Sequence, residues 1–186
     1  MSGDDRSLEQ LFRQAFRRLA ATVTVLTYLD PEGRPSGLTA TSVCSVSASP
    51  PTLLACVNRA SKARDHIHAQ GRFGVNILAS VQQDISNVCS RPGGEKVLPS
   101  TWLLEPAGDG GIPVLRAALA HLGCEMVGVH EEATHSIFVG QVGRIWLGEG
   151  RDPLVYFDGA YCALESESKA GASFDVLWDR YSSAFL

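Results

Sequence analysis

Short β-patterned segments occur along most of this chain, and most of the links between them are brief. The clearest pair is Leu154–Phe157 and Ala160–Leu164, because Asp-Gly between two apolar runs predicts a two-residue hairpin turn. The other such segments are Thr22–Leu29, Gly37–Ser49, Thr52–Val57, Phe73–Leu78, Leu122–Val129 and His135–Leu147. Links this short favour antiparallel pairing, since parallel strands need a crossover of roughly a dozen residues or more. The sequence therefore predicts roughly seven strands in a closed or partly closed β-barrel.

Three segments have the apolar spacing of helices. Ser7–Ala20 is amphipathic and begins with a serine that can cap it. Ser61–Gly71 has a serine at its start and a glycine where a C-terminal cap falls. Ser80–Cys89 is the third. The expected fold is mainly β with α, an α+β barrel with its helices packed outside.

Composition and charge limit what such a domain binds. The chain has 186 residues, of which 45% are hydrophobic and 19% charged, as in an ordinary globular domain. The net charge is −4 and no long basic block occurs, which argues against a nucleic-acid partner. No apolar run reaches membrane-spanning length and the polar N-terminus lacks the pattern of a signal peptide, so we expect no membrane association. Five cysteines without a CxxC pair predict reduced thiols in a cytoplasmic protein and no metal site.

The stretch Gly37–Pro51 alternates small apolar residues with serines and threonines. A period of two predicts a half-buried strand with the apolar side facing the barrel. The members of that side are Leu38, Ala40, Cys44, Val46 and Ala48. The hydroxyl side suits either a solvated edge strand or a flat ligand lying close to the backbone, and the stretch alone leaves both open. The next segment, Thr52–Val57, is apolar throughout, which predicts burial on both faces.

A candidate anion site follows this buried segment. Asn58 to Lys62 joins it to the start of a predicted helix, where free backbone amides and the helix dipole favour a phosphate. Ser90 and Arg91, after the next helix, offer a second cationic contact. Each feature also has a plainer interpretation, an ordinary capped helix and a surface arginine. Together with the hydroxyl-rich strand they indicate a nucleotide-like cofactor with a planar head.

Several motifs occur in a specific order along the chain: FRQAFRRLA before TVTVLT, then GLTATSVCSVSASPP, LLACVNRASKA, GRFGVNILA, THSIFVGQV and DPLVYFDGAY. In this order the chain resembles the short-chain flavin reductase family from Phe12 to about Glu165. The resemblance implies a split β-barrel of the FMN-binding type. It also implies a homodimer that binds FMN or FAD, takes hydride from NADH or NADPH and supplies reduced flavin to a partner flavin-dependent monooxygenase.

The resemblance also assigns site residues. The positions matching the segments around the flavin ring are Thr39, Ala40, Thr41, Ser42, Cys56, Val57 and Asn58. The positions matching phosphate or adenine contacts are Ser61, Lys62, Ser90 and Arg91. His135 matches the histidine near the nicotinamide and is the expected catalytic residue, although a histidine at the start of a strand also suits a local loop contact. Tyr156 is expected near the same groove. Two departures from the family pattern, Thr22 and Ala160, bear on cofactor preference.

The expected domain organisation is a flavin reductase-like domain over residues 1–165 and a C-terminal linker with an amphipathic tail over residues 166–186. The tail suits a helix packed on its own dimer or a contact with a partner protein. An alternative function also remains open at this point, a flavin- or haem-binding split barrel that acts as a carrier or sensor without catalysis.

Overall fold

The computed structural model describes residues 7–93, 96–104 and 111–164, and the predicted C-terminal tail lies outside them. The helices are α1 (Leu8–Arg17), α2 (Lys62–Gln70) and α3 (Gln83–Ser90), with short 3₁₀ turns at Ser80–Gln82 and Ser100–Trp102. The strands are β1 (Ala21–Thr22), β2 (Thr24–Leu29), β3 (Pro35–Ala40), β4 (Val43–Ala48), β5 (Pro51–Asn58), β6 (Arg72–Ile77), β7 (Ala120–Glu132), β8 (His135–Leu147), β9 (Val155–Phe157) and β10 (Ala160–Cys162). The mainly β fold with three helices is confirmed. The strand number was underestimated, because two of the expected strands are each broken in two.

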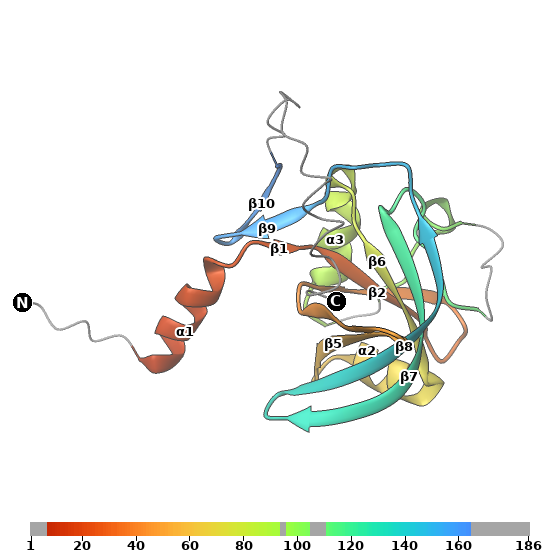
Figure 1. The fold of residues 1–186 in the computed structure, drawn as a ribbon, viewed down its shortest axis with the longest axis horizontal. Helices are drawn as coiled ribbons and strands as arrows, with labels where there is room; N and C mark the ends of the chain where they lie inside the picture. Colours follow the sequence, from red (N-terminus) through yellow and green to blue (C-terminus); the bar gives the residue numbers. More distant parts are fainter. Residues whose placement is uncertain (1–6, 94–95, 105–110, 165–186) are drawn as a thin grey trace, which may run out of the picture.

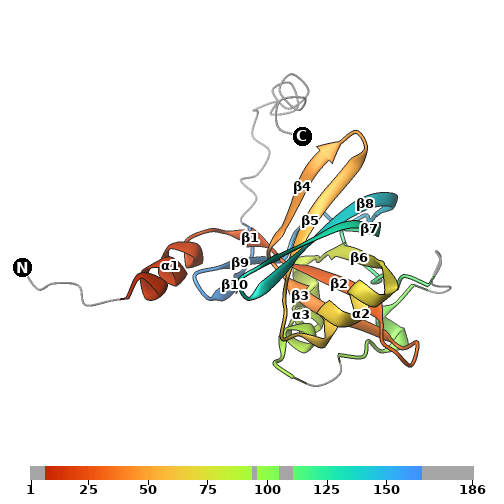
Figure 2. The same ribbon diagram turned by 90° about the horizontal axis from the view of Figure 1, so that it is seen from below.

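Seven strands form one antiparallel sheet in the order β3-β2-β6-β7-β8-β5-β4. A second, three-stranded sheet has the order β1-β9-β10, and its β9–β10 turn is the predicted Asp-Gly hairpin, with φ of 49° at Asp158 and 87° at Gly159. Figures 1 and 2 show the larger sheet strongly curved, with the β4–β5 hairpin projecting away from α2 and α3. This is the architecture of a split barrel.

The hydrophobic core has two parts. The first lies between the large sheet and α2 and includes Leu26, Phe73, Phe138 and Ile67, all fully buried. The second packs α3 and residues of two further segments, Leu98 to Leu103 and Leu115 to Ala118, against the other side of β2. Helices α2 and α3 are therefore packed outside the barrel, as predicted.

Helix α1 departs from that prediction. Ser7 caps it as expected, and Gln10 completes a capping box, so the local signal was correct. None of its residues is buried, however, and both ribbon views show it standing apart from the rest of the fold. Phe12 and Phe16 remain 59% and 58% exposed, so the amphipathic pattern has no partner surface within the described part of this one chain.

The prediction of one continuous strand over Gly37–Ser49 is wrong. The chain breaks at Thr41 and Ser42, and the register shifts again between Ser45 and Ser47 of β4. A one-residue change of register moves each side chain to the other face of a strand. Val43 consequently packs against the core, whereas the expected inward residues Cys44, Val46 and Ala48 are exposed.

The expectation for Thr52–Val57 is wrong for one face. Leu53, Ala55 and Val57 are buried, whereas Leu54 and Cys56 on the other face are only half-buried. The reason is that this segment belongs to the projecting β4–β5 hairpin, which packs on one side only (Figure 2). Among the described residues, no helix is long and apolar enough to cross a membrane.

Candidate functional site

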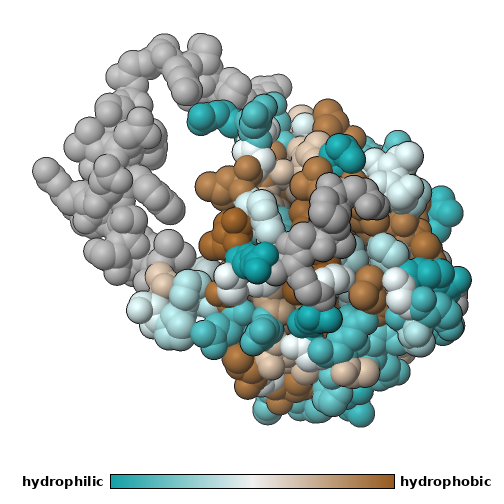
Figure 3. Space-filling model, turned by 90° about the vertical axis from the view of Figure 1, so that its right-hand side faces the viewer, coloured by the Kyte–Doolittle hydropathy of each residue, from teal (hydrophilic) through white to brown (hydrophobic). Residues whose placement is uncertain are grey.

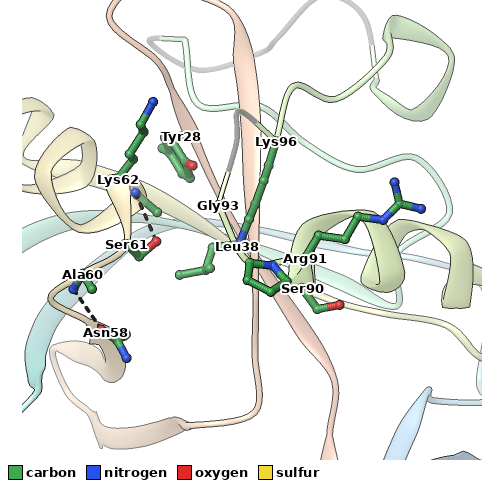
Figure 4. Close-up of a pocket in the computed structure, with 12 residues that line it drawn as sticks. Tyr28, Leu38, Asn58, Ala60, Ser61, Lys62, Ser90, Arg91, Gly93 and Lys96 are labelled. Carbon is green, nitrogen blue, oxygen red and sulfur yellow. Dashed lines mark hydrogen bonds between the residues drawn. The ribbon is translucent and has the colours of Figure 1, made fainter.

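The expected phosphate-binding residues gather around one cavity of about 480 Å³, shown in Figure 4. It lies between the start of α2 and the loop that follows α3. The residues lining it are Tyr28, Leu38, Asn58, Ala60, Ser61, Lys62, Ala63, Ser90, Arg91, Pro92, Gly93 and Lys96. Five of these were expected from the sequence, namely Asn58, Ser61, Lys62, Ser90 and Arg91. The structure therefore brings two loops, about thirty residues apart in sequence, to one space.

The loop that leads into α2 is held in shape by its own side chains. Asn58 Oδ1 accepts a hydrogen bond from the backbone N–H of Ala60 at 2.8 Å, and Ser61 Oγ caps the helix by accepting from the N–H of Ala63 at 3.3 Å. At the other end Gly71 takes the left-handed conformation that ends the helix, with φ of 67°. The first turn of α2 therefore faces the cavity with its positive dipole end, which suits a phosphate or another anion.

A second hollow of about 790 Å³ contains two of the seven residues expected around the flavin ring and both residues expected near the nicotinamide. Thr41 and Ser42, at the break between β3 and β4, line it together with His135 and Tyr156. Its opposite wall is α1 and the residues after it. The His135 side chain is exposed, and its Nδ1 lies 2.9 Å from Thr134 Oγ1.

Strand β5 connects the two spaces. Asn58 of the first cavity pairs with His135 across β5 and β8, and Ser42 Oγ donates to the carbonyl of Cys56 at 3.2 Å. The hydroxyls of the β3–β4 break and the helix start therefore lie at the same end of the sheet. This arrangement suits a ligand that has both an anionic group and a flat head.

Four expected residues line neither space. Val57 and Ala40 are buried in the core, so their side chains are not available to a ligand. Thr39 Oγ1 donates to the carbonyl of Ser86 at 2.8 Å and thereby ties β3 to α3. Cys56 is half-buried on β5, and its part in this region is its backbone carbonyl, which accepts the hydrogen bond from Ser42. These four residues lie on β3 and β5, as the sequence match implied, but their side chains are buried in the core, bonded to α3 or directed away from both spaces.

Three groups in the two spaces were not expected from the sequence. Tyr28 is buried in β2, and its place in that apolar stretch of sequence is typical of an ordinary core residue. Burial, together with nearby Cys89 and Asp30, raises the pKa of the Tyr28 hydroxyl to about 12. Lys96 follows an aperiodic Pro-Gly-Gly loop that carries no positional signal. The apolar face of α1 was recognised, but its place beside His135 was not. Within the described residues, no three His, Cys, Asp or Glu side chains gather closely enough to hold a metal ion.

An ionic network holds the turn before His135 against α2. The guanidinium of Arg64 donates from Nη2 to Glu131 Oε1 at 2.6 Å and from Nε to the buried Ser136 hydroxyl at 3.2 Å. Ser136 Oγ in turn lies 2.9 Å from Glu131 Oε2, and Arg59 Nε lies 3.3 Å from the same carboxylate oxygen. Hydrogen bonds from Arg64 and Ser136 hold the pKa of Glu131 below its usual value.

This network predicts a pH-dependent stability. Because folding lowers the pKa of Glu131, its carboxylate stabilises the fold above the unfolded value of about 4.3, and that contribution is lost as the pH falls through the folded pKa. We expect Glu131→Gln to lower the free energy of unfolding at neutral pH, with the difference from wild type shrinking as the solution is acidified. Urea unfolding over a series of pH values measures this. Glu132→Gln is the matched control, since Glu132 is 71% exposed and contacts only His130 at 3.5 Å among the ion pairs described. A gap between Glu131→Gln and wild type that stays constant with pH would contradict this account.

Comparison with known proteins agrees with this geometry. The family model described as "Flavin reductase like domain" matches residues 16–165. The FMN reductase (NADH) RutF of Stutzerimonas stutzeri is 38% identical over 157 residues, which cover 83% of this chain and 88% of that protein. The 4-hydroxyphenylacetate 3-monooxygenase reductase component of Pseudomonas aeruginosa is 36% identical over 166 residues, covering 87% of this chain and 95% of that protein.

Solved structures give the same result. BorF, the flavin reductase component of a bacterial two-component tryptophan halogenase, superposes with a TM-score of 0.76 at 30% identity, covering 86% of this chain and 99% of that one. The Streptomyces globisporus NADH:FAD oxidoreductase SgcE6 superposes with a TM-score of 0.75 at 28% identity, covering 88% and 96%. The resemblance inferred from the ordered motifs is thereby confirmed, and the chain belongs to the flavin reductase-like domain family.

Proposed function

We propose that this chain is an NAD(P)H-dependent flavin reductase that reduces FMN or FAD and supplies the reduced flavin to a partner flavin-dependent monooxygenase. One observation carries the proposal. Asn58, which lines the cavity suited to a phosphate, pairs across β5 and β8 with His135, the exposed histidine that lines the second hollow. The relatives support it, since SgcE6 is named an NADH:FAD oxidoreductase and BorF serves a tryptophan halogenase.

The residues present fit a flavin nucleotide. Ser61, Lys62 and the first turn of α2 suit its phosphate, and Ser90 and Arg91 close the opposite side of that cavity. Thr41 and Ser42 offer short hydroxyls where the chain breaks, so a flat ring can lie close to the backbone.

When bound, the flavin supplies the redox chemistry, because it accepts hydride from a nicotinamide. The contribution of the protein is alignment. His135 is exposed beside the break and would orient the nicotinamide by a hydrogen bond from its ring, and the network around Glu131 holds the turn before it in place. Tyr156 lines the same hollow and would limit how far the nicotinamide moves. No strong acid or base is required of either residue.

The functional unit we propose is a homodimer. The apolar face of α1 is exposed, and a further hollow of about 720 Å³ lies between the residues that follow α1, Leu19 to Thr22, and the barrel, where aliphatic residues of β4 to β8 form much of its lining. Hydrophobic residues also reach the surface in several places in Figure 3. A ten-residue helix that buries none of its residues is marginal in water, so a second copy of the chain is the expected cover for it. The catalytic domain we propose spans residues 1–165, with residues 166–186 as a separate tail, and five unpaired thiols favour the cytoplasm.

Kinetics with each nicotinamide and each flavin test the function. We expect NADH or NADPH to bleach the visible absorbance of FMN or FAD under anaerobic conditions, at a rate proportional to protein concentration. His135→Ala should lower kcat more than it changes the KM for flavin, while His68→Ala, an exposed histidine on α2, should match wild type. Tight flavin retention without nicotinamide oxidation would overturn the proposal in favour of a non-catalytic carrier.

A further inference from the structure

Lys96 lies on the wall of the cavity opposite the start of α2 and has a firmly held backbone. Its carbonyl accepts a hydrogen bond from the N–H of Gly37 at 3.1 Å, and two residues later the N–H of Leu98 donates to the carbonyl of Pro35 at 2.8 Å. Val97, between them, bridges to Ser36 of β3. These contacts with β3 therefore fix the position of the Lys96 backbone, from which the side chain extends.

The direction of the side chain distinguishes Lys96 from the other two cations of the cavity. In Figure 4 the Lys96 side chain runs into the space between Ser61 and Ser90, whereas the Lys62 ammonium and the Arg91 guanidinium point outward. Lys96 is half-buried, while Lys62 and Arg91 are exposed. The cation that best reaches the middle of the cavity is therefore one that the family motifs did not indicate.

The charge of Lys96 is not compensated by the described part of the protein. Among the described residues, no carboxylate forms an ion pair with it. The thiol of Cys89 is close enough to affect it electrostatically, but burial raises the pKa of that thiol to about 12, so it is neutral near pH 7. Burial also lowers the pKa of Lys96 itself, which indicates an ammonium that has lost water without gaining an anion.

We propose that Lys96 binds the flavin phosphate, so that its ammonium and the N-terminus of α2 hold the phosphate from opposite sides. The inference rests on the proposed function, because it places a flavin nucleotide in this cavity. A phosphate dianion would give Lys96 the counter-ion it lacks, through a charge-assisted hydrogen bond. It follows that Lys96 provides much of the preference for phosphorylated flavins over riboflavin, which has the same ring and ribityl chain but no phosphate.

The test compares FMN with riboflavin as ligands of the full-length chain, using quenching of flavin fluorescence to measure Kd. Lys96→Met keeps the aliphatic stem and removes the charge. We expect it to weaken FMN binding roughly tenfold to hundredfold, the range for a hydrogen bond to a charged group, and to leave riboflavin binding unchanged. Lys96→Arg should recover most of the FMN affinity. Arg151→Met, which removes one positive charge from an exposed loop residue outside the cavity, is the control and should match wild type.

Each outcome bears on the inference separately from the reductase activity. Unchanged FMN affinity in Lys96→Met, or an equal loss for FMN and riboflavin, would overturn it, the second because it marks a structural role. Wild-type protein that binds FMN no better than riboflavin would overturn it as well, and so would failure to bind any flavin. Selective loss of FMN binding in a protein that does not oxidise NADH or NADPH would support the role of Lys96 and contradict the proposed reductase function.

Discussion

Replacing Thr41 with tryptophan is expected to abolish flavin binding while leaving the fold intact. Thr41 lies in the two-residue break between β3 and β4, exposed and outside both core clusters, so an indole there displaces no buried side chain. It lines the hollow that contains His135, and the larger side chain would occupy the space in which the flat ring of the flavin is proposed to lie. Ligand sites of this kind are largely pre-formed and tolerate such filling poorly.

The expected loss is at least roughly a hundredfold in Kd, or about 2.8 kcal/mol. Fluorescence titration with FMN measures it, and far-ultraviolet circular dichroism with a thermal melt checks the fold. Val46→Trp is the matched control, because Val46 is 54% exposed on the same β4 hairpin but lines neither of the two spaces proposed for the flavin. A Thr41→Trp protein that melts like wild type and binds FMN with the wild-type Kd would remove Thr41 from the flavin site.

The same break explains why the sequence predicted this strand only in part. The alternation of Gly37–Pro51 is regular in sequence, but Thr41 and Ser42 leave the strand and the register shifts once more in β4. An alternating pattern does not show where a strand is interrupted, because threonine and serine occur in both strands and turns. The assigned inner face was therefore correct as far as Ala40 and reversed after it.

Signals that are local in sequence were predicted well. The capping serines of α1 and α2, the Gly71 C-cap and the Asp158-Gly159 turn are found where expected, since each depends on a few adjacent residues. The positions of Lys96 and of the apolar face of α1 do not follow from local signals. Their positions beside the cavities depend on contacts with distant segments, such as the hydrogen bond from Gly37 to Lys96, which no single stretch of sequence encodes.

The largest stability effect is expected from Asn76, a fully buried polar residue in the middle of β6. Its Nδ2 donates to the carbonyl of Val25 and to Thr27 Oγ1, both at 3.1 Å. Its Oδ1 accepts from the N–H of Leu115 at 2.9 Å and lies 2.8 Å from His121 Nδ1. One amide therefore joins β2, β7 and the segment that precedes β7.

Asn76→Leu keeps the approximate volume of the side chain and removes both ends of this network. The N–H of Leu115 then has no acceptor there, and Thr27 and His121 lose a partner inside the core. Each buried group left unsatisfied costs about 1–3 kcal/mol, so we expect a loss of about 3–5 kcal/mol in the free energy of unfolding, measured by urea titration. Asn87→Leu on the exposed side of α3 is the matched control and should change stability by less than about 0.5 kcal/mol. If Asn76→Leu unfolds within about 1 kcal/mol of wild type, the core can satisfy these groups in another way, and β6 does not depend on this amide to fix its neighbours.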